Sequence, residues 1–121
     1  MGTVFNPWEV WYARFPYEEA DGRYSKRPVI VLHASSAAVL VVKVTCHSSR
    51  GCDKFDVDLA EWEAAHLNRP SVARVSKVME ITPDNFVMKI GDLQNTDAFA
   101  IFKAYSHYLR TLPGSKLRFS A

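Results

Sequence analysis

The sequence predicts a mainly β fold with a short inserted helix and one C-terminal helix. Three observations predict it: several short runs of β-branched and aromatic residues, turn residues between these runs, and one late segment whose apolar residues have helical spacing. The chain has 121 residues, 48% of them hydrophobic, which suits a single domain over residues 1–121 with a buried core. We expect residues 115–121 to form a loose tail.

Polar loops separate three predicted strands in the first half of the chain. The two later strands are continuous apolar runs, typical of strands buried on both faces, and we expect Thr45 at the end of the second run. Asp21-Gly22 lies in the polar stretch before them and indicates an exposed loop, a kind of segment that often carries function. The predicted strands cover residues 8–15, 28–32 and 37–45.

The second half predicts an edge strand, a short helix and two further strands. Good helix formers fill residues 60–67, and Asp58 could cap this helix from just outside. Arg74 alternates with Val75 on a strand, so we expect Arg74 to be exposed. The predicted strands cover residues 55–59, 71–78 and 86–90.

The longest predicted helix follows these strands and ends at Pro113-Gly114. Asn95 or Thr96 is expected to cap its start. Apolar residues recur along it at helical spacing, so we expect this stripe to pack on the sheet. The stripe comprises Ala98, Ile101, Phe102, Tyr105, Tyr108, Leu109 and Leu112.

Composition and charge narrow the classes of function. No run approaches the roughly 18 to 20 apolar residues of a membrane span, and the first residues do not resemble a secretory signal, so we expect a cytoplasmic protein with no membrane partner. The net charge of +2 does not by itself indicate nucleic-acid binding, so any RNA site must be local. Cys46 and Cys52 are interpreted as free thiols.

Metal binding is not expected. Cys46, His47, Cys52 and His66 lack the paired spacing of a zinc site, and no cofactor motif is present. His33 and His107 are interpreted as packing or surface residues.

Several segments, taken together, carry a family resemblance. They are Glu9-Val10-Trp11 with Phe15-Pro16, Lys26-Arg27-Pro28-Val29-Ile30-Val31, Val42-Lys43-Val44-Thr45, and Trp62 to Lys77 followed by Ile90 to Leu93. Over nearly its whole length the chain resembles the MazF/PemK family of toxins, although Pro7-Trp8 replaces the glycine usual at the start. The resemblance implies a small SH3-like barrel of the CcdB/PemK type, which agrees with the predicted order of elements.

The resemblance also implies a function. Such a protein is the toxin of a type II toxin–antitoxin system and a sequence-specific endoribonuclease that needs no metal. It cleaves single-stranded RNA, such as mRNA, to 2′,3′-cyclic phosphate and 5′-hydroxyl ends. It forms a homodimer, and its cognate antitoxin lays an acidic, flexible tail across the RNA groove.

Four residues are candidates for catalysis. Arg27 matches the family's catalytic arginine, and its planar guanidinium suits bidentate contact with phosphate oxygens, although it could also be a surface residue before a proline. Thr45 matches the active-site threonine, and Ser25 could add a second hydroxyl from the loop. His47 is a hypothetical acid or base because histidine titrates near neutral pH; a solvated loop histidine is the alternative.

Six further residues are candidates for binding RNA. Cationic and hydroxyl side chains would contact phosphate, and tyrosines could stack on bases. Ser76 stands where some family members have an aspartate base, so that base is absent here. The candidates are Arg74, Lys26, Lys43, Ser76, Tyr17 and Tyr24.

Two other functions fit the same resemblance. CcdB toxins share the fold and poison DNA gyrase without catalysis, but their gyrase-binding tryptophan is C-terminal, and this chain ends Leu117-Arg-Phe-Ser-Ala121. The second alternative is a relative that binds RNA without cutting it. Ser76 in place of the aspartate base would fit this alternative.

Overall fold

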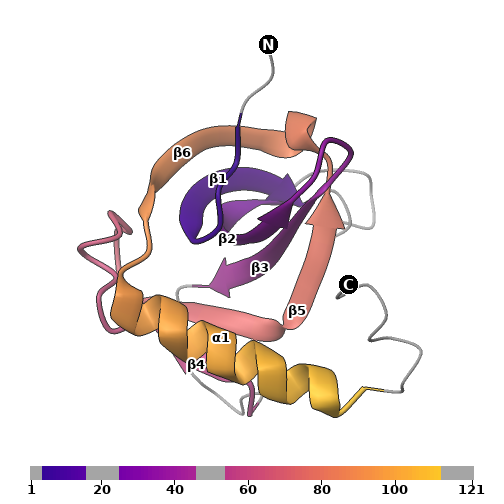
Figure 1. Ribbon diagram of the computed structural model, residues 1–121. Coiled ribbons are helices and arrows are strands. Elements are labelled where there is room, and N and C mark those ends of the chain that lie inside the picture. The colour runs from indigo at the N-terminus through magenta and orange to yellow at the C-terminus, as the bar shows by residue number, and fades with distance from the viewer. Residues whose placement is uncertain (1–3, 16–24, 46–53, 113–121) are drawn as a thin grey trace.

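In the computed structural model, residues 4–15, 25–45 and 54–112 are described. Within these ranges, six strands are followed by one helix, with a single 3-10 turn, η1, between the last two strands (Figure 1). The elements are β1 Glu9–Phe15, β2 Ser25–Ala34, β3 Val39–Thr45, β4 Asp56–Asp58, β5 Val72–Ile81, η1 Pro83–Asn85, β6 Phe86–Asp92 and α1 Asn95–Arg110. This confirms the mainly β fold and each of the strands predicted from the sequence.

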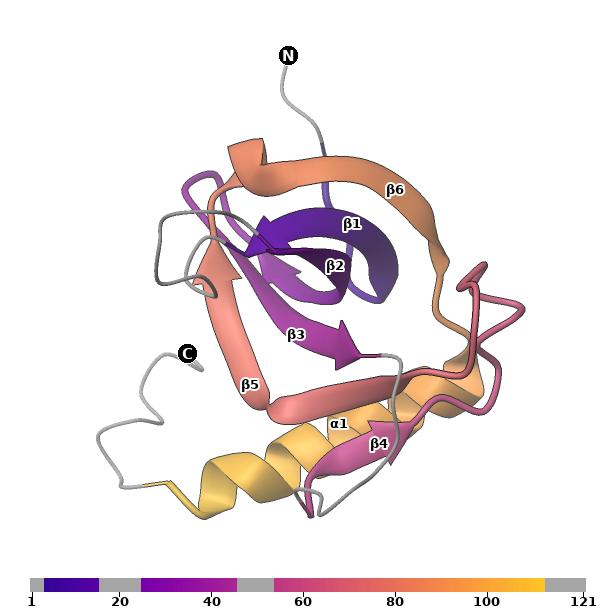
Figure 2. The ribbon, with the colours of Figure 1, turned by 180° about the vertical axis from the view of Figure 1, so that it is seen from behind.

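The strands form one curved sheet in the order β4-β5-β3-β2-β1-β6, and every neighbouring pair is antiparallel. β6 arches over β1 while β5 runs below β3, so the sheet curls into a small barrel-like shape (Figures 1 and 2). β4 lies at one end of the order, which confirms the predicted edge strand.

An irregularity in β5 helps to curl the sheet. Val42 of β3 pairs with Val78, but the next residue, Lys43, pairs with Arg74, so residues 75–77 have no opposite residue on β3. Extra residues of this kind bend a strand and increase its twist. β5 bends visibly in Figure 2, and its first half turns toward β4 and α1.

The central strands β2 and β3 are buried on both faces. Val29, Ile30 and Val31 are fully buried, and so are Val41 and Val42. Alternate residues enter two apolar clusters, one lined by Trp11 and Phe86 and the other covered by α1. The continuous apolar runs therefore indicated the burial of these strands correctly.

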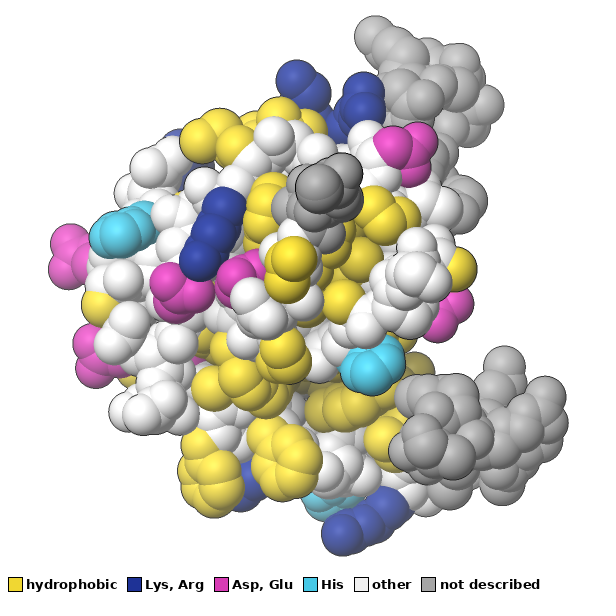
Figure 3. Space-filling view, turned by 45° about the horizontal axis from the view of Figure 1, so that its top comes forward, with side chains coloured by type: hydrophobic (Ala, Val, Ile, Leu, Met, Phe, Trp, Pro, Cys, Tyr) yellow, Lys and Arg dark blue, Asp and Glu magenta, His cyan; other side chains and the backbone are white. Residues whose placement is uncertain are grey.

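The long helix confirms its prediction in extent, with two corrections. Its N-cap is Gln94, which makes no side-chain capping bond, so the predicted caps Asn95 and Thr96 are wrong. Ile101 is fully buried, but Phe102 is 56% exposed, because it lies about 100° further around the helix. Phe99 is also exposed, and hydrophobic side chains gather on the side of the molecule where α1 lies (Figure 3).

Residues 60–66 form a series of turns, so the predicted short helix is wrong. The backbone N–H groups of Ala65, His66 and Leu67 bond to carbonyls four, three and five residues back, which is no helical repeat. Asp58 does not cap the segment. Instead Asp97 of α1 accepts hydrogen bonds from the backbone N–H groups of Ala60 and Glu61.

No helix among the described residues is long and apolar enough to cross a bilayer.

Candidate nucleic-acid site

A cavity of about 720 Å³ opens beside the start of β2 and the end of β3. The loop after residue 65 and strand β6 form its other sides. Its polar and charged lining residues are Tyr12, Lys26, Arg27, Thr45, His66, Asn68, Arg69, Ser71 and Lys89.

Arg27 and Thr45 both line this cavity, and each is half-buried. Val29 of β2 pairs with Lys43 of β3, and the same register continued by two residues sets Arg27 opposite Thr45. Directly opposite residues of an antiparallel pair point to the same face of the sheet. The guanidinium and the hydroxyl therefore enter one cavity from adjacent strands.

Cations dominate the charge of the cavity. Lys26, Arg27, Arg69 and Lys89 line it, and none of its described lining residues is an aspartate or a glutamate. Positive charge in a concave, partly apolar site attracts anions and raises their local concentration. Such a lining suits a phosphodiester group.

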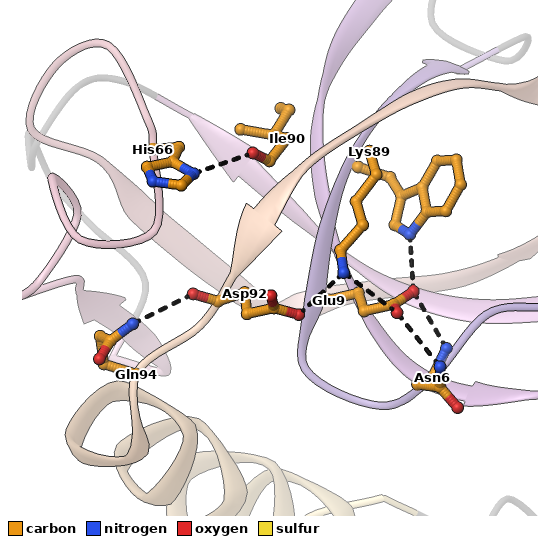
Figure 4. Close-up of polar contacts among 8 residues, drawn as sticks. Asn6, Glu9, His66, Lys89, Ile90, Asp92 and Gln94 are labelled. Atoms are coloured by element: carbon orange, nitrogen blue, oxygen red, sulfur yellow. Dashed lines mark hydrogen bonds and ion pairs between the residues drawn. The ribbon is translucent and has the colours of Figure 1, made fainter.

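Lys89 also belongs to a polar network at the back of β6 (Figure 4). Its Nζ lies 3.4 Å from Oε2 of Glu9 and 3.2 Å from Oδ1 of Asp92. The bond to Asp92 and the charge of Glu9 raise the pKa of Lys89 above its ordinary value. The ammonium of Lys89 is thus paired with two carboxylates that do not line the cavity.

Glu9 organises that network and fixes the start of β1. Its carboxylate accepts hydrogen bonds from Trp11 Nε1 at 2.9 Å and from the backbone N–H of Asn6 at 3.1 Å. Burial acts to raise the pKa of Glu9, but these hydrogen bonds and the charge of Lys89 outweigh it, so the pKa lies below its ordinary value. The Glu9-Val10-Trp11 motif therefore has a structural explanation.

A protein-family comparison matches residues 6–108 to the PemK-like, MazF-like toxin of type II toxin–antitoxin systems. The chain belongs to this family. The resemblance of the sequence to MazF/PemK toxins is thereby confirmed over most of its length.

Several solved structures of mycobacterial toxins share the fold. A mycobacterial endoribonuclease in complex with its cognate antitoxin is 15% identical, with a TM-score of 0.70 over 91% of this chain and 98% of that one. The Mycobacterium tuberculosis toxin MazF-mt6 is 22% identical, with a TM-score of 0.66 over 87% and 97%. A further mycobacterial endoribonuclease is 14% identical, with a TM-score of 0.68 over 93% and 96%. A search of curated proteins found no match.

The predicted RNA-binding residues of this MazF-like toxin divide into two groups. Lys26 lines the cavity, whereas Lys43, Arg74 and Ser76 are not among its lining residues. Arg74 is half-buried and donates to the carboxylate of Asp56, with Nη2 3.1 Å from Oδ2, so it is less exposed than predicted. Ser76 is half-buried in the irregular part of β5, and its carbonyl accepts a long hydrogen bond of 3.5 Å from Tyr108.

Other predicted site residues lie outside what the structure describes. Tyr17, Tyr24 and His47 fall in the ranges 16–24 and 46–53, as do Cys46 and Cys52, and residues 115–121 are likewise beyond the described part. Ser25 is the first residue of β2, and only its backbone is described.

The sequence interpretation missed several residues of the cavity wall. His66, Asn68 and Ser71 come from a loop, and Lys89 comes from a strand that pairs with β1. His66, Asn68 and Ser71 lie in the segment Trp62 to Lys77 that carries part of the family resemblance, but that resemblance gave them no role at the site; only the pairing of β6 with β1 brings Lys89 beside β2. Within the described part of the chain, no group of three or more histidines, cysteines and acidic residues is arranged to hold a metal ion.

Proposed function

We propose that this MazF-like toxin is an endoribonuclease that cuts single-stranded RNA, including mRNA, at specific sequences and without a metal ion. The observation that supports the proposal most directly is the convergence of Arg27 and Thr45 in one cationic cavity. The products would be a 2′,3′-cyclic phosphate and a 5′-hydroxyl. Because mRNA is the substrate, we expect the toxin to act in the cytoplasm.

The reaction requires stabilisation of a pentavalent phosphorane. The ribose 2′-oxygen attacks the adjacent phosphorus, and the bond from phosphorus to the 5′-oxygen breaks. Arg27 would donate two hydrogen bonds to the non-bridging oxygens, and Thr45 would donate a third from its hydroxyl. Both groups come from paired strands, so the strands place their backbones opposite each other before RNA binds, which favours electrostatic stabilisation.

Cations around the scissile group would guide the RNA backbone. Lys26 and Arg69 line the cavity on different sides and would contact flanking phosphates. Lys43 and Arg74 occupy opposite positions on β3 and β5 and would extend this track beyond the cavity, with Ser76 nearby. In this proposal Ser25 adds a hydroxyl, His47 passes a proton from water to the leaving 5′-oxygen, and Tyr17 and Tyr24 stack on unpaired bases.

We further propose an antitoxin partner and a homodimer. One solved relative is an endoribonuclease in complex with its cognate antitoxin. An acidic, flexible antitoxin segment would be attracted to the same cations of the cavity as RNA is, and it would inhibit by occupying the cavity. A purified complex with the neighbouring reading frame's product, followed by competition with RNA, tests this part.

RNA cleavage in EDTA tests the proposal. We expect site-specific cuts in a long single-stranded RNA, lost by about 10²-fold or more in Arg27→Ala and retained in Arg110→Ala. Arg110 is the matched control because it is exposed at the end of α1. Binding without cutting would favour the inactive relative, and inhibition of gyrase without cutting would favour the CcdB-like alternative; either result contradicts the proposal.

A further inference from the structure

His66 lies in the wall of the cavity that contains Arg27 and Thr45. Its imidazole is exposed, and its Nδ1 lies 3.2 Å from the backbone carbonyl oxygen of Ile90 on β6 (Figure 4). A carbonyl oxygen only accepts hydrogen bonds, so Nδ1 must carry the proton in this contact. In the neutral ring, Nε2 then holds the free lone pair.

The backbone fixes the place of this histidine. His66 has a φ of 69°, in the left-handed region that non-glycine residues rarely occupy and that is often retained at functional sites. Gly91 of β6 allows the turn to approach closely: a Cβ at Gly91 would lie 2.5 Å from the carbonyl oxygen of Ala65 and 3.0 Å from His66 Nδ1. The ring is therefore held against β6 in two ways: the turn packs closely on Gly91, and Nδ1 bonds to the carbonyl of Ile90.

We propose that His66 is the general base of the cleavage reaction, an assignment that rests on the proposed nuclease function. Fixing Nδ1–H by a backbone carbonyl is a common way to orient Nε2 toward its proton donor. The imidazole of His66 lines the same cavity as Arg27 and the other cations that would hold the phosphate. No aspartate or glutamate among the described lining residues competes for that role.

The proton balance of the step is simple. Nε2 of His66 takes the proton of the 2′-hydroxyl as the 2′-oxygen bonds to phosphorus. The bond from phosphorus to the 5′-oxygen breaks, and the 5′-oxygen takes a proton from water. The imidazolium returns its proton to the hydroxide that remains, so no net acid or base is consumed.

The test compares His66→Asn and His66→Gly with His33→Asn on the same RNA. Asparagine and glycine both tolerate a φ of 69°, so these variants are expected to keep the fold, which circular dichroism checks. His33 is exposed on β2 and does not line the cavity, so its variant is the matched control. We expect about 10²-fold slower cleavage for both His66 variants and an unchanged rate for His33→Asn.

Two further measurements identify the role as that of a base. Added imidazole should accelerate His66→Gly and leave the parent protein unaffected. An RNA with sulfur in place of the bridging 5′-oxygen has a leaving group that needs no proton, so the deficit of the His66 variants should persist with it. Unchanged cleavage by the variants, no imidazole rescue, or a deficit that vanishes with the sulfur substrate would each overturn the assignment.

A parent protein that cuts no RNA would instead overturn the proposed nuclease function, and this assignment with it.

Discussion

Asp97 and Ala60, 37 residues apart, are joined by a hydrogen bond of 2.8 Å from the backbone N–H of Ala60 to the carboxylate of Asp97. The second carboxylate oxygen accepts from the N–H of Glu61, also at 2.8 Å. Asp97 is 1% exposed and lies in the first turn of α1, where the helix dipole favours negative charge. This contact ties the turns of residues 60–66, and with them one wall of the cavity, to the C-terminal helix.

Replacing Asp97 by alanine should destabilise the protein. Two backbone N–H groups would lose a charged acceptor, which costs about 2 to 3 kcal/mol of unfolding free energy. Urea unfolding measures the change. Glu63→Ala is the matched control because Glu63 is exposed in the same turns, and it should change stability by less than about 0.5 kcal/mol. Equal stability of the two variants would contradict this role of Asp97.

Glu9 should make stability depend on pH in the acid range. Its pKa is lower in the folded state than its ordinary value of 4.5, so the folded protein holds the ionised form more strongly than the unfolded chain does. The resulting stabilisation is present above that ordinary value and is lost as pH falls below it toward the folded-state pKa.

The Glu9→Gln variant isolates this effect. Thermal unfolding midpoints measured from neutral pH downward should fall less steeply for Glu9→Gln than for the parent in the range below about pH 4.5. Parallel curves for the two proteins would show that Glu9 does not carry the dependence.

Arg69 should contribute to RNA affinity through charge rather than through base recognition. Each phosphate contact to single-stranded RNA contributes about 0.7 to the slope of log affinity against log salt concentration. Arg69→Ala should therefore weaken binding at low salt, reduce the slope by up to that amount, and leave the cleavage sequence unchanged. Arg110→Ala should keep the parental slope; a shift in cleavage sequence with Arg69→Ala would contradict this role.

Local sequence patterns predicted the strands well, and with them the positions of Arg27 and Thr45 along the chain. Arg27 directly precedes the apolar run of β2, and Thr45 is the last residue of β3. The ends of apolar runs can be located from local sequence alone. The family resemblance, rather than the pattern, suggested that they act together.

Other features depend on contacts between distant segments, which no local pattern contains. Residues 60–67 have helical propensity, yet Asp97 and the left-handed His66 hold them in irregular turns, so tertiary contacts override the propensity. Lys89 reaches the cavity only because β6 pairs with β1. Likewise, the bond of Arg74 to Asp56 requires the pairing of β4 with β5, and it explains why Arg74 is less exposed than alternation predicts.

A double-mutant cycle on cleavage rate tests most directly whether Arg27 and Thr45 act on one phosphodiester. Arg27→Ala and Thr45→Val should each slow cleavage by about 10² to 10³-fold in EDTA. If both groups stabilise the same phosphorane, the double variant should be much less impaired than the product of the two single losses, because each group depends on the other to position the phosphate. Losses that simply multiply, or single variants that cleave as fast as the parent, would contradict the account.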